Sequence, residues 1–295
     1  MTDAARISWE EPPETLRDPI LVAAFRGWND AGEAASFAAS HMAERWSARR
    51  FASIDPEEFY DFQVVRPQVR LVDGESREIT WPGNEFSMAV PGNSHRDVII
   101  LLGTEPNLRW KMFSSYIVDV IKRYEVGLVL TLGALLADVP HSRPVQITGT
   151  AVDRDLVARL GLQRSRYEGP TGIVGVLHDA CARAGIPSAS LWAAVPHYLA
   201  VTPNPKAALA LVDQATRLVG TSLDLGELEA ATAAYEDQVG EMVASDEDVK
   251  AYVQLLEDRT DQIILEENVG DARLPSGDAI AAELERYLQD RDPDE

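Results

Sequence analysis

The sequence predicts an α/β protein, a three-layer sandwich with a mostly parallel sheet and a C-terminal helical subdomain. Three observations indicate this class. Four apolar runs of five or six residues suit strands that are buried on both faces of a sheet. Helical patterns separate these runs, and this alternation is typical of right-handed crossovers between parallel strands. From residue 225 onward the pattern is only helical. The four runs are residues 20–25, 98–102, 128–132 and 191–195.

The first predicted strand leads into a helix over residues 31–46, where apolar side chains recur at intervals close to the helical period. Asp30 is a suitable N-cap for this helix. Between residues 59 and 90 the pattern changes to short β-like segments, and Asp73-Gly74 is typical of a hairpin turn. We therefore expect an antiparallel hairpin excursion at residues 59–90. Its strands are predicted at residues 59–65, 69–72, 78–81 and 85–90.

The alternation of strands and helices then resumes. The predicted order is strand 98–102, helix 108–124, strand 127–132, extended segment 145–150, helices 154–160 and 171–184, strand 189–195 and helix 205–220. Helices at 226–243 and 247–265 are expected to pair as an antiparallel hairpin, because the second carries apolar side chains along one side. Residues 270–276 are predicted to be a linker, residues 277–289 a last amphipathic helix, and residues 290–295 disordered.

The domain organisation follows from this pattern and from the charge. We expect an α/β core domain over residues 1–223, an acidic helical hairpin over 224–270, and a C-terminal helix with a disordered tail over 271–295. Residues 224–295 hold 22 of the 48 acidic side chains but 5 of the 27 basic ones, a local charge of −17 in a chain of net charge −21. This balance argues against nucleic-acid binding, which needs a basic surface, and favours a basic protein partner.

Cysteine usage and hydropathy indicate the compartment. The single cysteine, Cys181, cannot form an intramolecular disulfide, which fits a reducing environment. No apolar run approaches the roughly 18 residues of a membrane-spanning helix. We therefore expect a cytoplasmic protein that does not bind membranes.

A polar cluster follows each of the four predicted buried strands, and a further cluster forms the turn near residue 170. Because ligands of parallel sheets bind beyond the carboxyl ends of the strands, these clusters suggest one shared site. The ligand-binding candidates are Arg26, Asn29, Asp30, Glu105, Asn107, Arg109, Asp138, His141, Arg143, Glu168, Thr171 and His197.

The turn at residues 26–32 has two interpretations. It is either an anion site at a helix N-terminus, with Asn29 or Asp30 as a hydrogen-bonding ligand, or a capped tight turn. It lacks the GxGxxG and GxxxxGK[ST] spacings, so neither dinucleotide nor P-loop binding is supported.

The next strand end presents a carboxylate, an amide and a guanidinium. Glu105, Asn107 and Arg109 form a ligand set in the functional interpretation. In the structural one, Glu105 and Arg109 make a local salt bridge, Asn107 caps the helix, and Trp110 lies in the core.

Residues 138–144 bring together Asp138, His141, Ser142 and Arg143. A histidine beside an acid can act as a general base. The Asp-x-x-His-Ser spacing suggests a hydrolytic triad, but adjacency along an extended chain tends to splay the serine and histidine apart. The G-x-S-x-G elbow is also missing, so we do not predict a triad.

Two further candidates are ambiguous. Glu168 and Thr171 lie in a glycine-containing turn whose backbone amides can approach an anion, or which is a structural loop with Thr171 as N-cap. His197 either faces His141 across the crevice or is a satisfied buried group. No pair of histidines has the spacing of metal ligands, so we predict neither a metal nor a cofactor.

Together these motifs resemble the proteasome assembly chaperone 2 family, in its longer bacterial branch. The resemblance spans roughly residues 18–265 and includes AFRGWNDAG (24–32), FYDF (59–62), GTEPN (103–107), DVPHSRP (138–144), YEGPTG (167–172) and PHY (196–198). It implies a core similar to the phosphorylase/hydrolase-like sandwich and a chaperone role with proteasome α subunits as partners.

Two functions are therefore weighed. The first is a non-catalytic, chaperone-like factor that binds proteasome α subunits or other proteins through its acidic helical arm. The alternative is a small-molecule-binding protein or an enzyme of hydrolase, phosphorylase or ligase type that uses the polar crevice. We favour the first. We also expect a homo-oligomer, because Trp9, Trp81 and the hairpin excursion offer apolar surface beyond the needs of the core.

Overall fold

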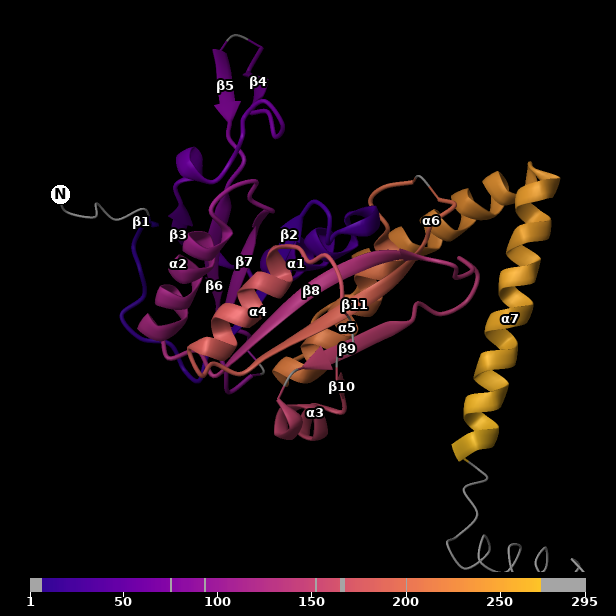
Figure 1. Cartoon of the computed structure of the whole chain (residues 1–295). Helices are drawn as coiled ribbons and strands as arrows, with labels where there is room; N and C mark the ends of the chain where they lie inside the picture. The colour runs from indigo at the N-terminus through magenta and orange to yellow at the C-terminus, as the bar shows by residue number, and fades with distance from the viewer. Residues whose placement is uncertain are drawn as a thin grey trace, which may run out of the picture.

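The computed structural model describes residues 7–271, except residues 75, 93, 152, 165–167 and 200. Within these residues the core is a nine-stranded mixed sheet with the order β1-β3-β6-β7-β2-β8-β11-β9-β10 (Figure 1). Its strands are β1 (Ile7–Trp9), β2 (Ile20–Arg26), β3 (Arg49–Ile54), β6 (Asn84–Ala89), β7 (Val98–Thr104), β8 (Leu128–Ala137), β9 (Ile147–Ala151), β10 (Gln163–Arg164) and β11 (Ser188–Pro196).

The four central strands, β7, β2, β8 and β11, run parallel to one another. On one side β6, β3 and β1 continue the sheet antiparallel, and on the other side β9 is antiparallel to β11. The sheet is therefore mixed, and the prediction of a mostly parallel sheet holds only for its centre. The links from β6 to β7 and from β8 to β9 are short and contain no helix, so the chain reverses direction at each, whereas a crossover between parallel strands needs a dozen or more residues.

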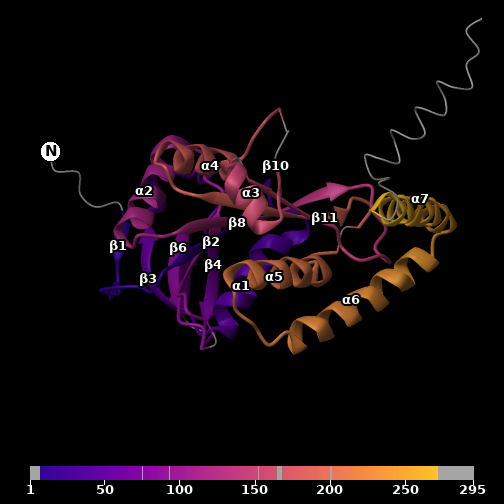
Figure 2. The ribbon, with the colours of Figure 1, turned by 90° about the horizontal axis from the view of Figure 1, so that it is seen from below.

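Helices cover both faces of the sheet (Figure 2). Ile20, Val22 and Ala24 of β2 pack towards α1 and α5, and the alternate residues Leu21 and Phe25 pack towards α2 and α4. Burial on both faces explains why the central strands are continuous apolar runs. The helices of the core are α1 (Ala34–Arg45), α2 (Trp110–Arg123), α3 (Arg154–Leu160), α4 (Ile173–Arg183) and α5 (Pro205–Val219).

The excursion at residues 59–90 differs in part from its prediction. Strands β4 (Gln68–Val72) and β5 (Ser76–Thr80) form the expected hairpin as a separate two-stranded sheet, whereas β6 joins the main sheet. The strand predicted at 59–65 is wrong, because this segment forms turns after a short 3-10 helix, η2 (Pro56–Glu58).

Two long helices follow the core, α6 (Gly226–Ala244) and α7 (Glu247–Asp271), and we call them the arm. Figure 2 shows α6 running from α5 outwards to α7. Helix α7 extends beyond the predicted end at residue 265 and takes in the start of the predicted linker; the rest of that linker, the helix predicted at 277–289 and the predicted tail lie outside the described residues. None of the helices described here has both the length and the apolar character needed to cross a membrane.

Candidate functional site

Four of the twelve predicted site residues, Asn29, Glu105, His141 and Arg143, lie in two separate places along the carboxyl ends of the central strands. The first, which we call the strand-end cluster, consists of Asn29, Glu105 and the first turn of α4. The second, which we call the arm latch, joins the segment after β8 to the arm. Its residues are His141, Ser142, Arg143, Tyr198, Lys206, Glu236, Glu257 and Asp261.

The Glu105 carboxylate is the centre of the strand-end cluster. Its Oε1 accepts hydrogen bonds from Asn29 Nδ2 at 3.0 Å and from the backbone N–H of Ile173 at 2.7 Å. Its Oε2 accepts one from the backbone N–H of Trp28 at 3.3 Å. Because Ile173 begins α4, the carboxylate lies where unpaired N–H groups and the helix dipole favour an anion.

The backbone approaches Glu105 so closely at Gly27 and Gly172 that a side chain larger than glycine does not fit at Gly172 without a shift. A Cβ atom added to Gly172 would lie 2.3 Å from Asn29 Nδ2 and 2.7 Å from Glu105 Oε1, and one added to Gly27 would lie 3.1 Å from Glu105 Cβ. The glycines of the two predicted anion-binding turns therefore allow a close approach, but the anion that they receive is the protein's own carboxylate.

Asp30 serves as a cap for α1, close to its predicted role. Its Oδ1 accepts hydrogen bonds from the backbone N–H groups of Ala35 at 2.7 Å and Ser36 at 3.2 Å. Its Oδ2 is buried and has no hydrogen-bond partner among the described residues. Burial raises the pKa of this carboxyl above its usual range, because desolvation disfavours the charged form.

Asn107 and Arg109 bind the segment that precedes the hairpin. Asn107 Oδ1 accepts a hydrogen bond from the backbone N–H of Asp61 at 3.0 Å, so it does not cap α2. Arg109 pairs with Glu58, and the salt bridge to Glu105 that the sequence allowed does not form. Both side chains thus fix residues 58–61 to the start of α2.

Three other candidates, Arg26, Glu168 and Thr171, make neither an ion pair nor a helix cap with the residues that the structure describes. Arg26 and Glu168 are exposed and make no ion pair with any residue that the structure describes. Thr171 lies just before α4, whose N-cap is Gly172, and its side chain does not cap the helix.

In the arm latch, Arg143 makes a bidentate ion pair with α7. Its Nε and Nη2 donate to the two oxygens of Asp261 at 2.8 and 2.7 Å, and its Nη1 lies 3.4 Å from Glu257 Oε1. Ser142 Oγ donates to the same Glu257 carboxylate. This fork geometry fixes α7 against the segment that follows β8.

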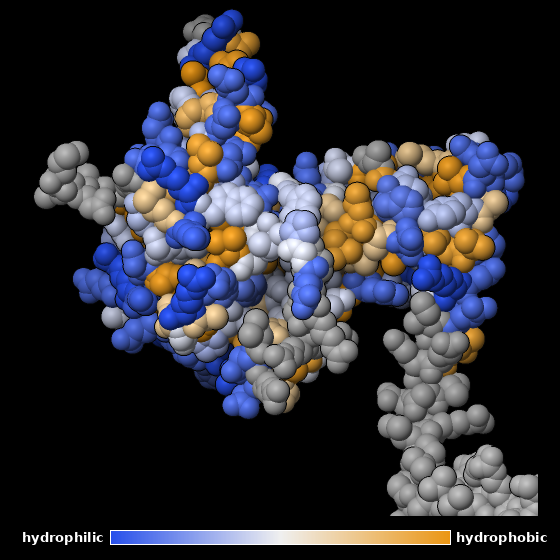
Figure 3. Space-filling view, in the orientation of Figure 1, coloured by the Kyte–Doolittle hydropathy of each residue, from blue (hydrophilic) through white to orange (hydrophobic). Residues whose placement is uncertain are grey.

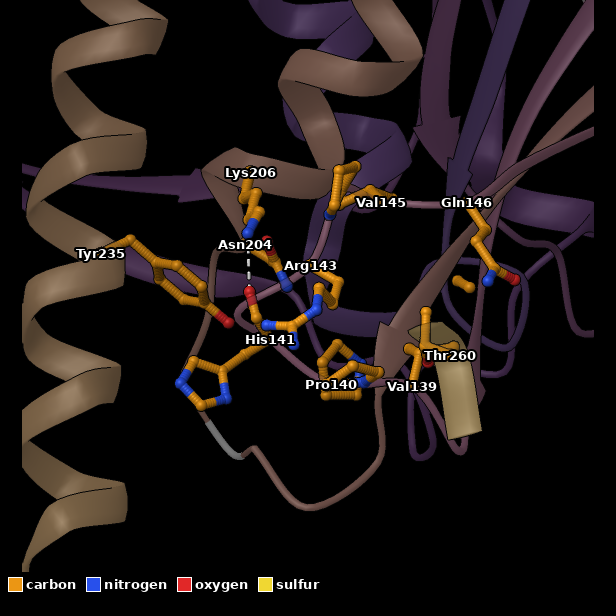
Figure 4. Close-up of a pocket in the computed structure, with 13 residues that line it drawn as sticks. Val139, Pro140, His141, Arg143, Val145, Gln146, Asn204, Lys206, Tyr235 and Thr260 are labelled. Carbon is orange, nitrogen blue, oxygen red and sulfur yellow. Dashed lines mark hydrogen bonds between the residues drawn. The ribbon is translucent and has the colours of Figure 1, made fainter. Parts of the chain in front are cut away.

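Lys206, at the start of α5, links the same segment to α6. Its Nζ lies 2.6 Å from Glu236 Oε1 and donates to the backbone carbonyl of His141 at 2.6 Å (Figure 4). Tyr198 Oη accepts from the backbone N–H of His141 at 2.8 Å and lies 2.9 Å from its Nδ1. The segment is therefore held from the core side as well as from the arm.

His141 of the latch and the nearby His197 do not form a hydrolytic triad. His141 pairs with Tyr198 and Ser142 with Glu257, so the two neighbouring side chains are bonded elsewhere. Burial and then the charge of Lys206 lower the pKa of His141 below its usual value. His197 lies 3.2 Å from Asp138, and its ring packs edge-on against Tyr252 of α7.

A small cavity lies behind the latch. It has a volume of about 20 Å³, enough for about one water molecule, and Figure 4 shows the side chains that line it, among them Arg143, Asn204 and Tyr235. A second, more open hollow of about 220 Å³ borders His141 and Glu257 between α6 and α7. Within the described part of the chain, no three His, Cys, Asp or Glu side chains are arranged to hold a metal ion.

No sequence pattern predicted the partners of Arg143 and His141 in the latch. Lys206, Glu236, Glu257 and Asp261 lie on helices, where charged residues usually face solvent, and no spacing pattern marks them. The ion pair between Arg143 and Asp261 joins residues 118 positions apart. Only the packing of the arm against the core brings them together.

Replacing Arg143 with alanine is expected to loosen the arm without unfolding the core. Without the fork to Asp261 and Glu257, the amides of α7 are expected to exchange hydrogen about tenfold faster, while those of β2 and β8 stay protected. Hydrogen exchange with mass spectrometry measures both. The control is Arg183→Ala, which removes an arginine that pairs with Asp179 on the exposed side of α4. Equal exchange of α7 in both variants would show that Arg143 does not hold the arm.

Comparisons with known proteins agree with this architecture. The model of the PAC2 family matches residues 24–243. A PAC2 family protein from Streptomyces avermitilis is 46% identical, with 80% of this chain and 99% of that chain covered and a TM-score of 0.74. A proteasome-assembly chaperone homologue from Mycobacterium tuberculosis is also 46% identical, with 79% of this chain and 99% of that chain covered and a TM-score of 0.73.

An archaeal proteasome activator from Pyrococcus furiosus, 20% identical, shares the fold with a TM-score of 0.66 over 80% of this chain and 97% of its own. No curated protein matches the chain. The family match and the two structures at 46% identity confirm the resemblance that the sequence motifs predicted, and the chain belongs to the PAC2 family.

Proposed function

We propose that this chain is a proteasome-assembly-chaperone-like protein that acts by binding proteasome-related proteins through its acidic arm. Membership of the PAC2 family supports this role, as does the 46% identity to a proteasome-assembly chaperone homologue. The observation that carries the proposal is that the polar side chains of the motifs make intramolecular contacts. Glu105 and Arg143 bind other parts of the same chain, so the conspicuous motifs support a scaffold.

The arm offers the surface for a partner. Residues 226–271 contain fourteen acidic and two basic side chains, and Asp237 and Glu241 on α6 are exposed. Such a charge favours a partner with a basic patch and speeds the encounter with it. The proposed partners are the α subunits of the proteasome.

The test is the affinity of the purified protein for proteasome α subunits of the same organism, measured by biolayer interferometry at low and high salt. We expect binding that weakens with salt, because exposed charges are screened. The double variant Asp237→Lys, Glu241→Lys is expected to bind about tenfold more weakly or worse.

The matched control is the double variant Asp119→Lys, Glu125→Lys. It makes the same change in net charge at one exposed position on α2 and another just after it, outside the arm. Equal affinity of the two double variants would show that the arm is not the contact surface. No binding by the wild-type protein would refute the proposed partner.

A further inference from the structure

The end of β8 has a neighbouring strand on only one side. Strand β11 pairs with β8 up to Ala137, whereas β2 pairs with it only up to Leu132. One further bridge joins Asp30 to Ala134, and the chain then turns into a 3-10 helix. Figure 1 shows β8 and β11 running on together towards the arm. Among the residues that the structure describes, residues 135–137 therefore form an open edge of the sheet, which we call the open edge of β8.

The open edge presents unpaired backbone groups. The N–H of Val129 donates to the carbonyl of Pro187, just before β11, and the N–H of Ala134 donates to the carbonyl of Asn29, just beyond β2. Because the backbone groups of successive residues point to alternate sides of a strand, Leu136 points its N–H and C=O away from β11, as Ala134 does. No described residue forms a backbone bond with them on that side. Leu136 thus offers a donor and an acceptor to an added strand.

Exposed apolar side chains flank the open edge. Leu135 and Leu136 point to opposite faces of the strand and are 45% and 59% exposed. Trp28, which is 66% exposed, precedes the residue whose carbonyl binds Ala134. Figure 3 shows apolar surface between the body and the arm. Soluble proteins usually protect an open edge with charges, proline or a bulge, so an edge that carries leucines fits the addition of a strand from another chain.

Charge indicates the chemistry of that chain. The 3-10 helix η1 (Ala31–Glu33) lies against β8 and brings an exposed carboxylate, that of Glu33, to this end of the strand. Asp138 directly follows the open edge, and its side chain is 65% exposed. Arg143 and Lys206, further on, are already paired with acids of the arm. These acids disfavour a second copy of a chain with a net charge of −21 and favour a segment with basic side chains.

We propose that the open edge of β8 binds an extended segment of a partner protein by strand addition, and that this segment combines apolar residues with lysine or arginine. The backbone of the segment pairs with Leu136, where a continuation of β2 would lie. Its apolar side chains cover the exposed leucines, and its basic side chains meet Glu33 and Asp138. This inference does not rest on the proposed function, because strand addition here involves β8 and not the arm.

Fluorescence anisotropy of a fluorescein-labelled KVTVK peptide, titrated with the full chain, tests the proposal without a proteasome subunit. The contact is short, so we expect a dissociation constant of about 0.1 mM. The same peptide with its three central amides N-methylated cannot donate to a strand and is expected to bind at least about tenfold more weakly. An EVTVE peptide, which faces like charges, is expected to bind at least about tenfold more weakly as well.

Two variants at one position test the protein side. Leu136→Pro removes the N–H of the open edge, which the pairing with β11 does not use, and proline is tolerated at such an edge position. We expect it to weaken binding of KVTVK at least about tenfold. Leu136→Val has a side chain of similar size to proline but keeps the N–H, and is expected to bind within about threefold of the wild type. Circular dichroism would show that both variants are folded.

Three results would overturn the proposal. The first is equal binding of KVTVK by the proline and valine variants. The second is equal binding of KVTVK and its N-methylated form by the wild-type protein, a comparison that needs no variant to fold. The third is a lower mass of Leu136→Pro than of Leu136→Val in sedimentation velocity, because a second copy would then cover the open edge.

Discussion

Glu105→Ala is expected to lower the free energy of unfolding by about 3 kcal/mol, because it removes a charged acceptor from three N–H donors at once. Two of these donors are backbone groups, in Trp28 and Ile173, and the third is the Asn29 side chain. The carboxylate joins the ends of β2 and β7 to α4, so its loss weakens the packing of a core helix. Urea denaturation followed by circular dichroism measures the change.

Two variants control this experiment. Glu105→Gln keeps one side-chain oxygen for the Ile173 N–H but loses the charge, and we expect about half of the loss. Glu125→Ala removes an exposed glutamate after α2 and is expected to change stability by less than about 0.5 kcal/mol. If Glu105→Ala lowered the free energy of unfolding no more than Glu125→Ala does, the strand-end cluster would not contribute to the stability of the fold.

The sequence was sufficient to predict the centre of the sheet. Strands buried on both faces are continuous apolar runs, and β2, β7, β8 and β11 include all residues of the four apolar runs. The edge strands were harder to predict from the sequence. Strand β3 begins with Arg49 and Arg50, which are exposed and make ion pairs, so it lacks the apolar run that marks a buried strand. The segment 59–65 has aromatic residues typical of a strand, but Asp61 and the contacts of Asn107 favour a turn.

For the candidate site, the motifs could be located but their partners could not. The sequence left open whether the glycine turns after β2 and before α4 bind an anion or are structural, and in the structure both contact the Glu105 carboxylate. Nothing in the spacing indicated that Glu105, 68 residues away from Ile173, would supply it. Likewise Arg109 pairs with Glu58, 51 positions away, and not with its neighbour Glu105. Contacts over such distances depend on the topology of the sheet, which local patterns do not specify.

One polar network between α4 and the sheet, at the edge of the core, was not foreseen at all. His178 of α4 lies between two hydroxyl groups, with Nε2 2.9 Å from Thr131 Oγ1 and Nδ1 2.8 Å from Ser188 Oγ. No carboxylate is part of this network among the described residues. Burial therefore lowers the pKa of His178 to about 4.

This pKa predicts a loss of stability in acid. In the unfolded chain a histidine takes up a proton near its usual pKa of about 6.5, whereas His178 in the folded protein resists protonation down to about pH 4. The unfolded state thus binds more protons over this interval. We expect the free energy of unfolding to fall by about 3 kcal/mol between pH 7 and pH 4 through this group, with little further fall below.

Comparison with His178→Gln isolates the effect from other titrating groups such as Asp30, which the two proteins share. The glutamine variant loses part of the hydrogen bonding at pH 7 and is expected to be less stable there, but it has no proton to gain. Its deficit relative to the wild type is therefore expected to shrink by about 3 kcal/mol as the pH falls to 4 in urea denaturation experiments. A constant deficit across this range would show that His178 is not held neutral, and that its neighbours Thr131 and Ser188 stabilise the charged ring as well as the neutral one.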